Sequence, residues 1–405
     1  MAEPFNEADE DQLNAPAAKP PRPLNISTSS STYYGGTIPE QDDDSSSASS
    51  MSSTGTVIPS PGRALFARPM GPSSGGGLGG GGRSLDPIPW TTYFEREVWV
   101  ETATQKGDGV KERVRHHAYL TSPAGSKGPL FVTHHGAGSS GLSFAVLSAE
   151  IRKRLPMAGI LSLDARGHGG TRVITEGGVG EGEGAVDLSL ATFSRDLFNV
   201  IQETKREMNW GELPPIILVG HSLGGAVVTE LAKSGLLGPT VLLGYAVLDV
   251  VEGSAMDALQ SMQTYLSTRP TGFATLRDGI EWHVRSRTVR NAVSARTSVP
   301  ALLVDSRVGE GKDEEGGKKG SEGDGTAVKG RGSGSSRPWR WRTDLAATQP
   351  FWEDWFVGLS KKFLEARGGK LLLLAGTDRL DTELTIGQMQ GESFFFFFFT
   401  IPLCR

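Results

Sequence analysis

Residues Ile216 to Ala226 read IILVGHSLGGA, and this stretch decides the fold that the 405-residue chain is expected to adopt. Four apolar residues typical of a buried strand come first, a Gly-x-Ser-x-Gly turn around Ser222 follows, and a helix-like run begins directly after it. A serine nucleophile needs such a sharp turn, because the turn projects its hydroxyl above the sheet and the flanking glycines prevent side-chain collisions. We therefore interpret Ser222 as a nucleophile.

The alternation of strand and helix continues on both sides of this turn. Strands are expected over residues 94–101, 114–120, 130–133, 159–163 and 370–375, and another within residues 240–251 that ends at Asp249. Helices are expected over residues 144–155, 188–208, 226–231 and 351–366. Continuous apolar strands that alternate with helices predict a mostly parallel central sheet with helices on both faces. Together with the nucleophile turn, this pattern indicates the α/β class and the α/β-hydrolase fold. Residues 256–296 look helical and are expected to form a cap over the site.

Composition divides the chain into one domain and several low-complexity segments. Residues 1–86 are rich in Ser, Gly, Pro and Asp and cannot bury enough apolar surface to offset their ordering entropy, so we expect them to be disordered. Residues 87–391 are expected to form the hydrolase domain, interrupted at 306–337 by a charged, Gly/Ser-rich insertion that we interpret as a disordered surface loop. Residues 392–405, with six consecutive phenylalanines, form an aberrant tail.

Charge and cysteine content narrow the function classes. The formal net charge of -5 gives no reason to expect binding to nucleic acid or to an anionic membrane. Cys404 is the single cysteine, so an intramolecular disulfide is impossible, which suits a reducing compartment. No basic N-terminal region precedes an apolar core, and no apolar run approaches the roughly 20 residues that span a bilayer. We expect a soluble cytoplasmic or nuclear protein.

Neither a cofactor nor a metal ion is expected. The sequence holds no Gly-x-Gly-x-x-Gly after a strand and no group of His, Cys and carboxylate residues at metal-ligand spacing. The glycine runs near residue 75 follow no strand and precede no helix, which indicates a linker instead of a phosphate-binding loop.

A second glycine-rich turn supports the nucleophile. His135-Gly136-Ala137-Gly138 follows a short apolar strand, where lipase-like hydrolases place an oxyanion-hole loop. We expect the oxyanion donors to be the backbone N–H of Leu223, at the start of the helix after Ser222, and that of Ala137 or its neighbour Gly136.

The residues leave the acid of a catalytic triad open. Asp249 follows the strand after the nucleophile helix, whereas Asp378 and Asp381 follow the strand at 370–375. The base must be a histidine that takes the serine proton, and the fold orders it after the acid. The seven histidines are His116, His117, His134, His135, His168, His221 and His283.

Chain order leaves only His283 as a candidate base. This residue belongs to the expected cap and precedes the last clear strand, where a packing or surface histidine is the better interpretation. We therefore expect the catalytic histidine to be absent from this chain.

Five blocks of sequence, in this order, make the chain resemble the protein phosphatase methylesterases. They are HGAG at 135–138, DARGHG at 164–169, GHSLGG at 220–225, LDVVEGSAM at 248–256 and GTDRLD at 376–381. The resemblance covers about residues 90 to 391. It implies hydrolysis of the methyl ester on the C-terminal leucine of the phosphatase 2A catalytic subunit, with release of methanol. It also implies that Asp249 is the acid, and that Asp381 is structural or lies on the substrate side.

The sequence departs from this family near its end. The family continues with one more strand and a turn that carries the catalytic histidine, whereas here Glu392 and Ser393 precede six phenylalanines and Thr-Ile-Pro-Leu-Cys-Arg. Our hypothesis is a faulty gene model in which translation ran into a T-rich intron, and a genuine truncated isoform is the alternative. A splice junction near codon 391 would support the first, whereas transcripts that end as written would contradict it. As written, the chain is expected to lack the last strand and the histidine turn and to show little esterase activity.

Two other functions stay open. One is a general carboxylesterase or lipase, and the other is a catalytically dead protein that binds the phosphatase without hydrolysis. In the run RPWRWR at 337–342, Arg340 and Arg342 could bind an acidic peptide tail through charge and cation–π contacts, or could anchor a loop.

Overall fold

The computed structural model describes seven ranges of the chain. They are residues 84–105, 111–125, 128–176, 186–307, 336–375, 380–390 and 395–398. The chain divides into two units, residues 1–53 and 54–405, and every described residue belongs to the second. The predictions of disorder before residue 84 and over most of the 306–337 insertion therefore lie outside the described residues, as does the tail apart from 395–398.

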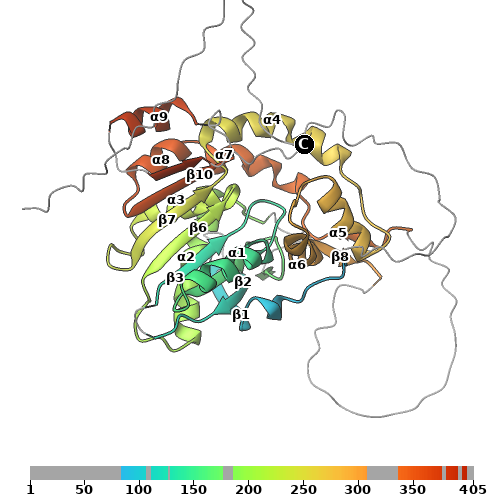
Figure 1. Ribbon diagram of the computed structural model, residues 1–405, viewed down its shortest axis with the longest axis horizontal. Helices are drawn as coiled ribbons and strands as arrows, with labels where there is room; N and C mark the ends of the chain where they lie inside the picture. The colour runs from blue at the N-terminus through green and yellow to red at the C-terminus, as the bar shows by residue number, and fades with distance from the viewer. Residues whose placement is uncertain are drawn as a thin grey trace, which may run out of the picture. The chain divides into compact units, whose positions relative to one another are not determined.

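A nine-stranded, mostly parallel sheet forms the centre of the described part (Figure 1). Its strands lie in the order β1-β2-β4-β3-β6-β7-β10-β11, and β5 pairs with β2. β2 is antiparallel to β1, β4 and β5, whereas all neighbours from β4 to β11 are parallel. The strands are β1 (Arg96–Gln105), β2 (Lys111–Thr121), β3 (Leu130–His134), β4 (Gly159–Asp164), β5 (Arg172–Glu176), β6 (Ile216–His221), β7 (Leu242–Leu248), β10 (Gly369–Leu374) and β11 (Phe395–Phe398). The predicted α/β-hydrolase fold is confirmed.

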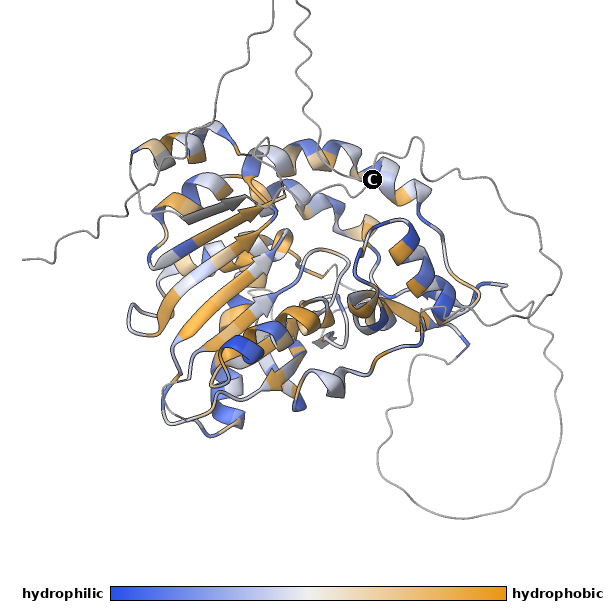
Figure 2. Ribbon diagram, in the orientation of Figure 1, coloured by the Kyte–Doolittle hydropathy of each residue, from blue (hydrophilic) through white to orange (hydrophobic). Residues whose placement is uncertain are grey.

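Helices cover both faces of this sheet because its parallel strands are apolar on both sides, as their colour in Figure 2 shows. On β3, Leu130 and Val132 join the core that contains α2 and α3, whereas Phe131 between them packs with Ala145 of α1. The apolar face of α2, which includes Phe193, is buried in the first of these cores. The helices are α1 (Ala145–Arg154), α2 (Leu190–Glu207) and α3 (Leu223–Ser234).

The structure corrects the expectation that the last strand is missing. Phe395–Phe398 forms β11, which pairs in parallel with Leu371–Leu374 of β10. A sheet ladder uses backbone groups, and phenylalanine is favoured in strands, so a run of phenylalanines can extend the sheet.

Residues 84–86, which composition assigned to the N-terminal segment, are described and make contacts within the fold. Arg296 donates from its Nε to the carbonyl oxygen of Asp86 at 2.6 Å, and Ile88 donates to the carbonyl oxygen of Arg296 at 3.0 Å. Leu85 packs against the cap. These contacts are mostly made by backbone, which explains why composition did not predict them.

Three helices form the predicted cap. α4 (Glu252–Thr268), α5 (Leu276–Arg285) and α6 (Ala292–Leu302) follow β7, and β8 (Leu303–Asp305) pairs with β9 (Trp339–Trp341) beside them. α5, α6 and β8 share a core that is separate from that of the sheet and contains Phe273, Ile280, Ala295, Val299 and Leu303. α4 instead packs on the core of the sheet, to which its Ala255 belongs. Within the described ranges, no helix is both long and apolar enough to cross a bilayer.

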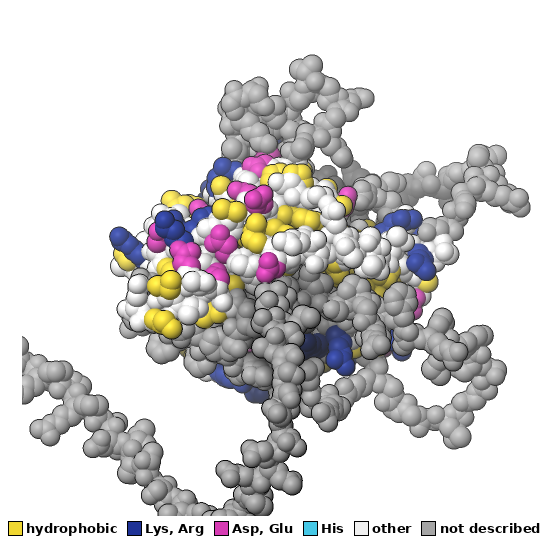
Figure 3. Space-filling model, turned by 90° about the horizontal axis from the view of Figure 1, so that it is seen from above, with side chains coloured by type: hydrophobic (Ala, Val, Ile, Leu, Met, Phe, Trp, Pro, Cys, Tyr) yellow, Lys and Arg dark blue, Asp and Glu magenta, His cyan; other side chains and the backbone are white. Residues whose placement is uncertain are grey.

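The C-terminal helices complete the fold. They are α7 (Trp352–Phe356), α8 (Leu359–Glu365) and α9 (Thr382–Met389). α9 exposes two large apolar side chains, since Ile386 is 48% and Met389 is 83% exposed. Figure 3, which views the side of α4 and α9, shows hydrophobic side chains interspersed with acidic and basic ones.

The turn between β6 and α3 depends on two glycines that leave no room for a side chain. A Cβ atom on Gly224 would lie 2.0 Å from the carbonyl oxygen of His134, and one on Gly220 would lie 2.0 Å from the carbonyl oxygen of Gly224. Because both obstacles are backbone atoms, no rotamer change can relieve the clash. β3, β6 and α3 therefore lie so close together that only glycine fits at positions 220 and 224.

Gly224→Ala is expected to lower the free energy of unfolding by about 3 kcal/mol or more, because the added methyl group must push β3 away from α3. Gly235→Ala is the matched control, since Gly235 ends α3 at φ 72° and an added Cβ would have nothing within 4 Å. The control should cost only about 1 kcal/mol. Urea unfolding measures both values, and equal losses would contradict the close contact.

Candidate active site

Ser222 lies on the turn itself, directly after β6. Its backbone has φ 53° and ψ -123°, a positive-φ conformation that costs about 1–3 kcal/mol in a residue other than glycine. Its N–H donates to the carbonyl oxygen of Leu248 at 3.1 Å, and its own carbonyl oxygen accepts from Gly225 at 2.7 Å. The half-buried serine is thus held at the edge of the sheet where the parallel strands end.

The predicted oxyanion loop packs against this turn. A Cβ atom on Gly136 would lie 3.1 Å from the Cβ of Ser222 and 3.3 Å from the carbonyl oxygen of His221. The N–H groups of Ala137 and Leu223 donate no hydrogen bond to any described residue. N–H groups in the first turn of a helix have no partner within it and carry the positive end of its dipole. The arrangement could therefore stabilise an oxygen that gains negative charge beside Ser222.

Three buried histidines lie beneath this loop and are neutral near pH 7. Burial lowers the pKa of His134 to about 4. Burial, together with the neighbouring histidines, holds the pKa of His135 well below its usual value. Burial also lowers the pKa of His168, against the attraction of the Asp164 carboxylate.

Asp249 is the first residue after β7, and β7 is the strand next to β6. His221 pairs with Leu248 in the sheet register, so that Ser222 and Asp249 follow at the same level of the two strands. Asp249 also has a positive φ of 56°, and its Oδ1 accepts a hydrogen bond from the N–H of Ala375 at 3.0 Å. The end of β10 therefore fixes the carboxylate, a contact that sequence reasoning missed because Ala375 contributes only backbone.

Asp381, one of the alternatives for the acid, has a structural role. Its Oδ1 accepts from the N–H of Leu384 at 3.0 Å, and its carbonyl oxygen accepts from the Thr385 hydroxyl at 2.8 Å. Its Oδ2 accepts from the hydroxyl of Ser360 on α8. Asp381 thus caps the start of α9 and ties it to α8. Asp378, the other alternative, lies outside the described residues.

His283 is a packing residue of the cap. Its Nδ1 donates to the carbonyl oxygen of Gly279 at 2.7 Å, and the residue is 2% exposed among the rings of Phe273, Trp282 and Trp341. All seven histidines lie among the described residues, and none of them forms a hydrogen bond with the Ser222 hydroxyl. The structure assigns no histidine to the triad.

Arg342 anchors its own loop. Its Nε donates to the carbonyl oxygen of Ala301 at 3.2 Å, and its N–H donates to that of Leu302 at 2.9 Å. Arg340 lies on β9, opposite Val304 of β8. The geometry favours loop anchoring for Arg342, and peptide binding by the two arginines stays a prediction.

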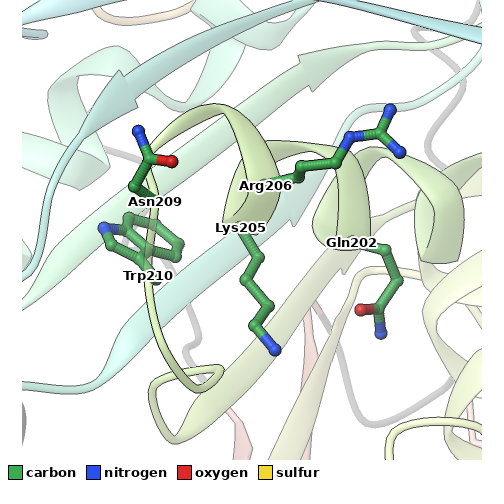
Figure 4. A pocket seen from close by; sticks show the side chains of 5 residues that line it. All are labelled: Gln202, Lys205, Arg206, Asn209 and Trp210. Atoms are coloured by element: carbon green, nitrogen blue, oxygen red, sulfur yellow. The ribbon is translucent and has the colours of Figure 1, made fainter.

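A hollow of about 450 Å³ opens at the C-terminal end of α2 (Figure 4). Its lining residues are Gln202, Lys205, Arg206, Asn209 and Trp210. This end of α2 leads to Ile216 at the start of β6, whereas Ser222 follows the end of β6. The hollow therefore lies at the opposite edge of the sheet from the candidate site. Among the described residues, no group of three or more His, Cys, Asp or Glu side chains is placed to hold a metal ion.

The chain matches a known family and several named relatives. The family described as Alpha/beta hydrolase matches residues 130–398. Protein phosphatase methylesterase 1 of Neurospora crassa is 64% identical over 403 residues, which cover 96% of this chain and 81% of the relative. The proteins of the same name from Gibberella zeae and Homo sapiens are 64% and 40% identical, over 84% and 81% of this chain and 74% and 84% of their own lengths.

The buried neutral histidines are expected to make stability fall as the pH falls. An unfolded histidine has a pKa of about 6.5, so below this pH the unfolded chain binds protons that the folded chain does not, and unfolding becomes easier. For His134, with a pKa of about 4 in the fold, lowering the pH from 7.5 to 5.5 should remove about 1.4 kcal/mol from the free energy of unfolding. His135 and His168 add losses of the same sign.

Urea unfolding at the two pH values measures this change. The control is the interval from pH 7.5 to pH 8.5, over which these histidines are neutral in both states and should contribute nothing. Equal stability at pH 7.5 and pH 5.5 would show that the rings accept protons in the folded chain.

Proposed function

Because the chain belongs to the protein phosphatase methylesterases, within the α/β hydrolases, we propose that its substrate is the C-terminal leucine methyl ester of the phosphatase 2A catalytic subunit. The chain is a carboxylic ester hydrolase of the methylesterase type. The observation that carries the reaction is the strained Ser222 beside the N–H groups of Leu223 and Ala137, which have no hydrogen-bond partner among the described residues. The names of the relatives support a phosphatase as the substrate.

In this proposal, Ser222 Oγ attacks the carbonyl carbon of the ester, and the carbonyl oxygen gains a negative charge. The N–H groups of Leu223 and Ala137 stabilise that oxygen, and Gly136 lets it approach without a side chain in the way. The intermediate then collapses to an acyl-enzyme: the bond from the carbonyl carbon to the methoxy oxygen breaks, and the base gives the serine proton to that oxygen, so methanol leaves. Water then releases the free leucine carboxylate. A single oxyanion donor is typically worth about 10²- to 10³-fold in rate.

Asp249 is proposed to orient the base that takes the serine proton. Its carboxylate lies on the strand next to Ser222 and is fixed by Ala375. No described histidine occupies the place between them, and a triad without its base keeps only the contributions of binding and of the oxyanion hole. Free imidazole can accept the serine proton from solution, so we expect it to accelerate the reaction.

Methanol release from the methylated phosphatase 2A catalytic subunit tests this proposal, with and without added imidazole. The parent chain is expected to release methanol faster than buffer does. Ser222→Ala should reduce the release to the buffer rate in both conditions, because no acyl-enzyme can form without Oγ. Asp249→Asn, which keeps the shape and tolerates positive φ, should lower the imidazole-dependent rate by about 10-fold or more.

Two comparisons separate the alternatives. A leucine methyl ester on an unrelated peptide is the substrate control, and equal rates on both substrates would indicate a general carboxylesterase. Absence of Ser222-dependent release in either condition would contradict the esterase. Co-precipitation of the phosphatase by the inactive chain would then support the catalytically dead binding protein.

A further inference from the structure

Two loops leave the sheet side by side at the edge that carries Ser222. Residues 135–138 follow β3 and residues 165–170 follow β4, and these strands pair in parallel with His134 opposite Leu163. The fully buried carboxylate of Asp164, at the end of β4, accepts hydrogen bonds from the N–H groups of Gly141 at 2.7 Å and Gly170 at 2.8 Å. The carboxylate thus binds backbone N–H groups from both segments, Gly141 after the first loop and Gly170 at the end of the second.

One histidine from each loop reaches across to the backbone of the other. His135 Nε2 accepts a hydrogen bond from the N–H of Ala165 at 2.9 Å. His168 Nε2 accepts a hydrogen bond from the N–H of Gly138, also at 2.9 Å. The two rings lie 5.1 Å apart, and each residue is only 1% exposed. The loops are therefore joined by two reciprocal bonds that water does not reach.

The remaining nitrogen of each ring sets its protonation state. His135 Nδ1 donates to the carbonyl oxygen of Gly136 at 2.8 Å, and His168 Nδ1 donates to that of Arg166 at 2.9 Å. Each ring must therefore carry its proton on Nδ1 and present a bare Nε2, which only a neutral imidazole can do. The buried surroundings, which hold both pKa values down, maintain this state.

These bonds fix the peptide group that supplies an oxyanion donor. The Gly136 carbonyl and the Ala137 N–H belong to one planar trans peptide, so they point in opposite directions. The Gly136 oxygen accepts from His135 Nδ1 at 2.8 Å and from the Ser139 N–H at 3.1 Å, which leaves the Ala137 N–H turned to the other side. The next peptide is held by His168 through the Gly138 N–H.

We propose that His135 and His168 are positioning residues that clamp the oxyanion loop and aim the Ala137 N–H at the oxygen that becomes charged. The catalytic part of this inference rests on the proposed function, whereas the clamp itself does not. Neither histidine touches the substrate. Both act through the backbone of residues 136–138.

Two substitutions of His168 separate the hydrogen bond from the bulk of the ring. His168→Gln retains an acceptor near the place of Nε2, whereas His168→Leu fills similar space and leaves the Gly138 N–H without a partner. His116→Leu is the matched control, because His116 is equally buried but bonds through Nε2 to Thr102, away from the loop.

Hydrogen exchange of the Gly138 amide, followed by mass spectrometry, measures the protection given by its hydrogen bond to His168 and does not require catalytic activity. We expect protection to be lost in His168→Leu and kept in His168→Gln and His116→Leu. A Gly138 amide that stays protected in His168→Leu would overturn the clamp, whatever the outcome of the demethylation assay.

The rate constant for labelling of Ser222 by a fluorophosphonate, with imidazole present, measures how well the proposed oxyanion hole stabilises the charged oxygen. Ser222 Oγ bonds to phosphorus, fluoride leaves, the proton goes to imidazole, and the phosphoryl oxygen gains negative charge on the way. The rate constant should fall about 10- to 100-fold in His168→Leu and stay near the parent value in His168→Gln and His116→Leu. An unchanged rate in His168→Leu, or an equal fall in either other variant, would overturn the positioning role.

Discussion

The whole site depends on the contact between the backbone of Gly224 and the carbonyl group of His134, where an added Cβ would lie only 2.0 Å away. This approach brings the chain after β3 against the chain after β6. It places Gly136 beside Ser222. The close packing of the two turns thus depends on the absence of two side chains.

Much of this arrangement could be read from the residues because it has a local signature. The apolar runs of β3, β4 and β6 are continuous, as buried parallel strands require, and the glycines around Ser222 mark the turn. The position of Asp249 was one of three alternatives until the resemblance favoured it. The structure places it on the strand next to Ser222 and gives Asp381 a helix cap, which removes that competitor on geometric grounds.

What the residues did not reveal is carried by backbone groups or by contacts between distant segments. The Ala375 N–H that holds Asp249, and the Gly138 N–H that bonds to His168, leave no pattern in the side chains. His168 was weighed only as a candidate base, since chain order is visible in a sequence and the partner of a ring nitrogen is not. The strand at Phe395–Phe398 was missed because the tail was interpreted as aberrant, whereas the sheet ladder that it forms with β10 uses only backbone groups.

The identical side chains around Phe395–Phe398 affect the register of this strand along β10. It is drawn from a run of six identical residues, Phe394 to Phe399, of which four pair with β10. A slip of one residue along β10 normally exchanges the side chains on the two faces, but here it exchanges phenylalanine for phenylalanine. Three four-residue windows fit the run, and equal occupancy of all three would contribute a mixing free energy of about 0.6 kcal/mol. Several registers of this strand along β10 are therefore equivalent in sequence.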